Sequence, residues 1–112
     1  MGSKEHDDVS LFHIHLLLKL KEIEEYPFTK LVIEKELTKE EYQEIIKLVN
    51  AINEEYLMQK EEGLLDVTPL LLHFVGMLNH KLEPEQTIYA LKKEGYYPSL
   101  MSEFLNLPVF KG

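Results

Sequence analysis

Apolar residues recur every three or four positions along most of the chain, which is the spacing of one face of an α-helix. No segment alternates apolar and polar residues as a half-buried strand does. The pattern therefore predicts an all-α fold, a compact bundle of about six helices with short loops, in which the first and third helices are long. The expected helices span residues 7–24, 27–36, 39–62, 68–80, 83–95 and 97–106.

Capping residues stand at the ends of these segments. Thr38 and Glu41 have the spacing of a capping box, in which the two side chains satisfy free backbone amides. Gly63 and Gly95 suit the left-handed conformation that ends a helix. Thr68 is expected to cap the fourth helix, whose face is the most apolar and belongs at the centre of the core. Proline favours a first helical position, and it occurs there at Pro27, Pro69, Pro84 and Pro98.

The chain is expected to form a single domain, because two separate cores within 112 residues would be too small to be stable. Residues 1–6 are expected to be a disordered tail, and residues 107–112 a C-terminal tail. The segment from Leu107 to Phe110 is too apolar for a free end. We therefore expect it to dock on its own domain or on a partner.

The first expected helix carries more apolar surface than one contact needs. The main apolar stripe of this helix, which begins at Val9, is flanked by a second stripe formed by Leu11, Ile14 and Leu18. A surface helix usually has a narrower apolar face, so we expect this helix to be covered both by its own core and by a neighbouring chain. The sequence thus predicts a homo-oligomer, a dimer or a trimer. Its self-association stripe consists of Val9, Phe12, Leu16, Leu20 and Ile23.

Most aromatic residues lie on apolar helix faces and are expected in the core. Tyr96 and Tyr97 differ, because they fall in a short loop between two helices, where an exposed aromatic pair favours recognition. Together with Phe110 they form a second hypothetical surface, a groove that captures a helix of another protein.

The charge balance argues against several classes of partner. Acidic residues outnumber lysines by 20 to 12, and arginine is absent. Nucleic acids and anionic membrane surfaces are bound mainly through positive charge, so neither is an expected partner. The longest nearly apolar run, residues 67–78, is too short to span a bilayer. The chain has no cysteine, which excludes disulfides and suits a cytoplasmic location.

The histidines do not form a recognisable metal motif. His13 and His15 point about 200° apart on one helix, so they would meet only as a pH-sensitive ring or metal site at a symmetry axis. The alternative function is a small metal-binding protein or enzyme that uses His73, His80 and nearby carboxylates. No Glu-x-x-His pair, phosphate-binding loop or nucleophile elbow is present. We therefore expect no enzyme, no catalytic residue, no cofactor and no metal.

Several short segments, in this order and spacing, resemble the YhaI-like family of small uncharacterised proteins of bacilli, classed as a domain of unknown function. The resemblance covers roughly residues 9–105 and omits both ends of the chain. It implies an all-helical cytosolic fold that assembles into homo-oligomers, and it implies no activity, cofactor or catalytic residue. The segments are Tyr26-Pro27-Phe28, residues 37–41, Gln59-Lys60 with Gly63, Leu78-Asn79 with Lys81-Leu82, and Thr87-Ile88 with Ala90-Leu91 and Gly95.

Overall fold

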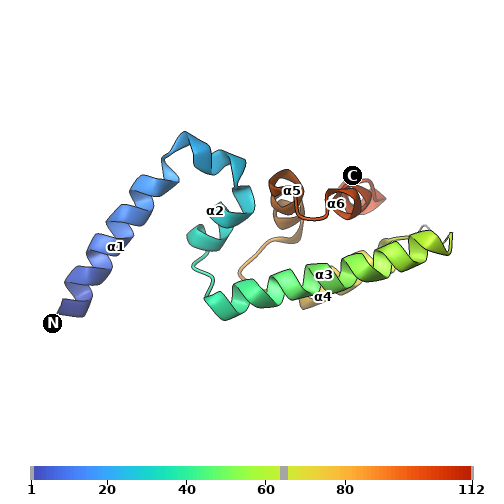
Figure 1. Cartoon of the computed structure of the whole chain (residues 1–112), viewed down its shortest axis with the longest axis horizontal. Coiled ribbons are helices and arrows are strands. Elements are labelled where there is room, and N and C mark those ends of the chain that lie inside the picture. The colour runs from blue at the N-terminus through green and yellow to red at the C-terminus, as the bar shows by residue number, and fades with distance from the viewer. Residues whose placement is uncertain (1, 64–65, 112) are drawn as a thin grey trace.

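The computed structural model describes residues 2–63 and 66–111, with side chains from residue 9 onward. These residues form six α-helices and two short 3-10 helices and no strand, which confirms the all-α prediction (Figure 1). The α-helices are α1 (Gly2–Leu18), α2 (Pro27–Glu34), α3 (Lys39–Glu61), α4 (Thr68–Met77), α5 (Pro84–Glu94) and α6 (Pro98–Leu105). The 3-10 helices are η1 (Lys21–Glu25) and η2 (Pro108–Phe110).

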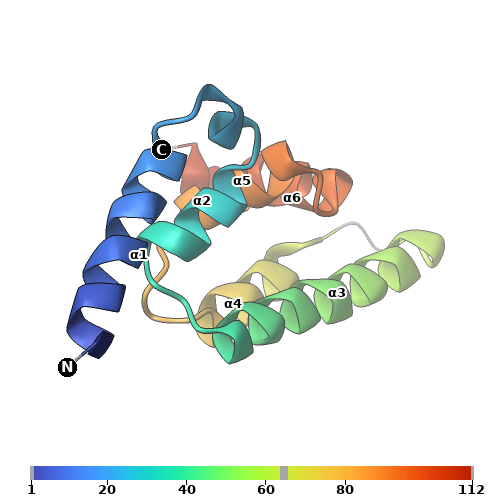
Figure 2. The same ribbon diagram turned by 60° about the vertical axis from the view of Figure 1, so that its left-hand side comes forward.

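Helices α2 to α6 form a two-layer bundle, and α1 projects from one end of it. Helices α3 and α4 lie side by side in one layer, while α2, α5 and α6 form the other (Figure 2). The molecule measures 59 × 27 × 24 Å, with a radius of gyration of 16.6 Å. A compact domain of this length would have a radius of gyration of about 13 Å. The projection of α1 accounts for the difference (Figure 1).

Each helix from α2 to α6 contributes buried apolar side chains to one core. Phe74 of α4 and Phe104 of α6 have ring centroids 6.1 Å apart, and the Phe28 ring of α2 lies 5.7 Å from that of Tyr96. Burying such large side chains is the main favourable term in folding. The apolar side chains with almost no exposed surface are Phe28, Val49, Ile52, Phe74, Ile88, Leu91, Leu100, Met101 and Phe104.

The first and fourth helices end earlier than predicted, and the third is the longest. After Leu18 the amides of Lys19 and Leu20 bond to carbonyls three residues back, and Leu20 then turns into an extended conformation. Residues 2–6, which the sequence placed in a tail, continue α1 at its start. Helix α4 ends at Met77 because the Asn79 side chain accepts the Lys81 amide at 2.8 Å and stabilises a turn there.

Most of the predicted caps are confirmed. Thr38 and Glu41 form the capping box, with N···O distances of 2.9 and 3.1 Å. Gly63 and Gly95 have φ angles of 84° and 97°, as left-handed helix ends require. Thr68 is not the cap of α4. Its amide instead donates to the Asp66 carboxylate at 3.0 Å, since Thr68 is already helical.

The C-terminal tail docks on its own domain. Leu107 and Phe110 are half-buried and pack against the core, while Val109 remains exposed. The apolar Leu107–Phe110 segment therefore covers part of the bundle, as its composition predicted.

Candidate functional site

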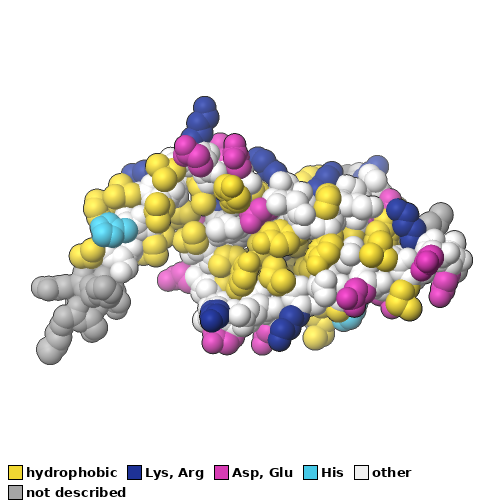
Figure 3. Space-filling view, in the orientation of Figure 1, with side chains coloured by type: hydrophobic (Ala, Val, Ile, Leu, Met, Phe, Trp, Pro, Cys, Tyr) yellow, Lys and Arg dark blue, Asp and Glu magenta, His cyan; other side chains and the backbone are white. Residues whose placement is uncertain are grey.

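Helix α1 carries an apolar surface that the bundle does not cover. Its large side chains are between 45 and 58% exposed and lie next to one another, and a patch of this kind is more informative than a single exposed leucine. Figure 3 shows hydrophobic side chains gathered along the projecting helix. Contiguous apolar patches of this kind mark interaction sites. We call this region the α1 apolar surface; it consists of Val9, Phe12, Leu16 and Leu17 of α1 and of Leu20, which follows the helix.

Only one flank of α1 meets its own bundle. Ile14 and Leu18 are half-buried and, with His15, border a hollow of about 480 Å³ against Ile33 and Glu34 of α2. At 100° per residue, Val9, Phe12 and Leu16 lie on the opposite side of the helix. The bundle therefore covers part of the side of α1 that carries Ile14 and Leu18. The bundle does not cover Val9, Phe12, Leu16 and Leu20 of the predicted self-association stripe, which are about half exposed. Ile23, the last residue of that stripe, lies in η1 and is half-buried.

A second apolar surface lies between α4 and the C-terminal tail. It is a groove of about 470 Å³ in which Leu72 and Val109 are 67 and 71% exposed. Val75 is 41% exposed in this groove, because α4 is apolar on more than its buried side. We call it the α4–tail groove; its apolar walls are Leu71, Leu72, Val75, Leu107, Val109 and Phe110.

The three residues of the predicted helix-capturing surface do not line one groove. Tyr96 is half-buried on Phe28 and borders a separate hollow with Tyr42 and Ile46. The neighbouring Tyr42 hydroxyl and burial raise the pKa of Tyr96 to about 12. Tyr97 donates a hydrogen bond to Asn50 at 2.7 Å. Phe110 instead lines the α4–tail groove.

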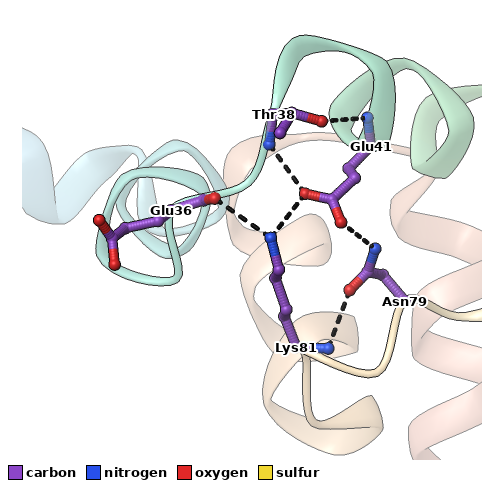
Figure 4. Close-up of polar contacts among 5 residues, drawn as sticks. All are labelled: Glu36, Thr38, Glu41, Asn79 and Lys81. Atoms are coloured by element: carbon purple, nitrogen blue, oxygen red, sulfur yellow. Dashed lines mark hydrogen bonds and ion pairs between the residues drawn. The ribbon is translucent and has the colours of Figure 1, made fainter.

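A polar cluster joins the α2–α3 loop to the α4–α5 loop (Figure 4). The Glu41 carboxylate accepts from the Lys81 ammonium at 2.8 Å, from the Thr38 amide at 2.9 Å and from the Asn79 amide group at 2.9 Å. Lys81 also donates to the Glu36 carbonyl at 3.4 Å. These donors, Lys81 foremost, lower the pKa of Glu41 to about 2. The cluster satisfies its own polar groups, so its evident role is to hold two loops together.

The histidines with described side chains are exposed and separate. His13 and His15 lie on α1, His73 lies on α4, and His80 follows α4 in a loop. Among the side chains of residues 9–63 and 66–111, no group of three or more His, Asp or Glu could hold a metal ion.

Residues 8–108 match the model of a protein family described as "Protein of unknown function (DUF1878)". The chain belongs to the DUF1878 family. The matched region contains the whole of the α1 apolar surface and most of the α4–tail groove, so both surfaces lie within the DUF1878 domain. In the part of this DUF1878 protein that the structure describes, no helix has the length and apolar character needed to cross a bilayer.

Proposed function

We propose that this DUF1878 protein is a cytoplasmic homo-oligomer that acts as a protein-interaction or regulatory module, and that α1 provides its self-association face. One observation carries the proposal: α1 projects from the bundle while Val9, Phe12 and Leu16 remain about half exposed. The proposal includes no catalytic residue or cofactor, and neither a nucleic acid nor a membrane as partner.

The energetics favour self-association through this helix. Covering a half-exposed leucine or phenylalanine contributes roughly 1 kcal/mol, about half the value for complete burial. Several such side chains on each copy would be covered at once when two α1 helices pair. In a symmetric pair each residue of the patch meets the same patch on the other copy, so the contact closes as a dimer. A trimer would bring three α1 helices to one axis.

Leu16→Glu tests the proposal. Leu16 is 45% exposed, so a carboxylate there remains solvated in an isolated chain but is buried without a partner at an α1–α1 contact. Light scattering after size exclusion should give two or three times 13.2 kDa for the wild type and about one chain mass for the variant. Circular dichroism should show that the variant keeps its helices.

Leu57→Glu is the matched control. Leu57 is 53% exposed on α3, outside the α1 apolar surface, and the substitution adds the same charge. It should leave the oligomer mass unchanged. A wild-type monomer at micromolar concentration would refute the proposal, as would an equal loss of mass in both variants.

We also infer that, within the family, this chain is one of the YhaI-like proteins of bacilli. The segments quoted above from residues 26–95 support that assignment, and they lie inside the family match.

A second interaction function is favoured by the α4–tail groove. Its walls are almost entirely apolar, and Phe110 lies among them, as a groove that captures an amphipathic helix requires. Leu72→Glu should then abolish binding of a stoichiometric partner protein while leaving self-association through α1 intact. Loss of the oligomer in Leu72→Glu alone would instead place the self-association face at this groove.

A further inference from the structure

A groove of about 620 Å³ runs between α2 and α5, which pack side by side. Its volume lies within the range of small-molecule sites, about 300 to 1,000 Å³. Leu31 of α2 and Ala90 of α5 form its buried floor, and the ring of Tyr89 forms an exposed wall. The middle of the groove is therefore apolar.

The relative direction of α2 and α5 decides which charged side chains lie together at one end of the groove. The amide and hydroxyl of Thr29 donate to the two carboxylate oxygens of Glu94, at 2.9 and 2.8 Å. The first turn of α2 therefore meets the last turn of α5. Lys30 follows Thr29, and Lys92 and Lys93 precede Glu94, so three groove-lining lysines gather at this end. The polar side chains Glu34 and Gln86 lie toward the other end.

The lysine end keeps an excess of positive charge. The nearby Glu94 carboxylate, which accepts two hydrogen bonds from Thr29, offsets one of the three lysine charges and leaves the other two. The one ion pair among the described residues joins Lys81 to Glu41, so none of the three groove lysines has an ion-pair partner there. This concentration of positive charge is unusual on a chain with a net charge of −8. It attracts anions where most of the surface repels them.

Helix stability explains only part of this arrangement. Lys92 and Lys93 lie in the last turn of α5, where positive charge favours the helix dipole. Lys30 lies in the first turn of α2, where positive charge opposes the dipole. The helix dipole therefore does not explain Lys30, which lines the groove.

We propose that the α2–α5 groove binds a small amphipathic anion, with its acid group among Lys30, Lys92 and Lys93 and its apolar body along Leu31, Ala90 and Tyr89. A hydrocarbon or aromatic carboxylic acid has this chemistry. The site is separate from the α1 apolar surface and does not depend on the function proposed above.

Decanoate is the probe, with decylamine as the ligand that has the same hydrocarbon chain and the opposite charge. In amide-resolved NMR titrations of the full chain, decanoate should shift signals from residues 27–34 and 86–94 in a saturable manner. Decylamine should not shift these signals saturably. Added salt should weaken decanoate binding, because the lysines are partly solvated.

Lys93 is exposed and Lys30 is half-buried, and neither side chain belongs to the core. The double variant Lys30→Gln and Lys93→Gln should weaken decanoate binding about tenfold, as expected for the loss of two solvated charge contacts. Lys39→Gln, which removes an exposed charge from the start of α3, is the control and should bind as the wild type does. Repeating the titration with Leu16→Glu separates this site from self-association, since decanoate should bind that variant equally well.

Three results would overturn the proposal. One is the absence of saturable binding below about 1 mM. Another is decanoate binding mapped to α1 or to the α4–tail groove. The third is equal affinity in the double-lysine variant and the wild type.

Discussion

At the scale of single residues, the carboxylate of Glu41 connects two parts of the chain. It receives hydrogen bonds from Thr38, Asn79 and Lys81, which lie at the start of α3 and in the α4–α5 loop. The capping half of this cluster follows from the Thr-x-x-Glu spacing. Its other half, the contact with Asn79 and Lys81, joins positions about 40 residues apart and has no local sequence signal.

Glu41 should make folding stability sensitive to acid. Its pKa is about 2 in the folded protein against 4.5 for the free group, so ionised Glu41 favours the folded state. This contribution is complete above about pH 4.5 and is lost as the pH falls toward 2. Glu41→Gln should lower the urea midpoint at pH 7, and the gap from wild type should narrow between pH 4.5 and 2.

Glu40→Gln is the control for Glu41, because it removes an exposed charge from the same helical turn. It should change the midpoint less at pH 7. Equal midpoints for Glu41→Gln and wild type at pH 7 would show that the cluster does not stabilise the fold.

Glu36 has a left-handed backbone with φ of 53°, at a helix end where glycine is usual. The Leu37 amide bonds to the Val32 carbonyl at 3.0 Å, which completes the helix-ending motif around it. Glu36→Gly should raise the free energy of unfolding by roughly 0.5–1 kcal/mol, since relief of strain exceeds the greater freedom of glycine in the unfolded chain.

Chemical denaturation measures the effect of Glu36→Gly. Glu44→Gly inside α3 is the comparison, and it should lower stability by about 1 kcal/mol because glycine is unfavourable within a helix. A loss of stability in both variants would contradict the account of Glu36.

At the scale of elements, local signals predicted most helix starts and failed at two helix ends. A proline is the first residue of α2, α5 and α6 and the second residue of α4, and a glycine follows the end of α3 and of α5. No proline or glycine occurs between Leu18 and Tyr26, so the end of α1 carried no signal in the sequence. The pairing of α2 with α5 was also unpredictable, because Thr29 and Glu94 lie 65 residues apart.

The contact between Thr29 and Glu94 should stabilise the pairing of α2 with α5. Glu94 caps α2 from another helix, since it accepts the Thr29 amide that α2 itself leaves free. Thr29→Val keeps the shape of the side chain and removes the hydroxyl. It should lower the free energy of unfolding by about 1 kcal/mol in urea or guanidinium denaturation.

Glu94→Ala should be more destabilising than Thr29→Val, because it removes the acceptor of both hydrogen bonds. The order of the two variants therefore tests the contact. Stability equal to that of the wild type in both would show that this contact contributes nothing to the fold.

At the scale of the whole molecule, the sequence predicted an apolar first helix with two contact faces, and the structure shows one flank of it against α2. The excess of leucine over residues 9–20 was visible in the sequence. The exposure of these leucines depends on the angle between α1 and the bundle. The connection through η1 sets this angle, and the apolar pattern does not encode it. The α2–α5 groove depends in the same way on how distant helices meet.

The molar mass of the unmodified chain in solution tests the central claim most directly. Sedimentation equilibrium from low to high micromolar concentration should give two or three times 13.2 kDa, with dissociation only at the lowest concentrations. A mass of 13.2 kDa over the whole range would contradict self-association through α1.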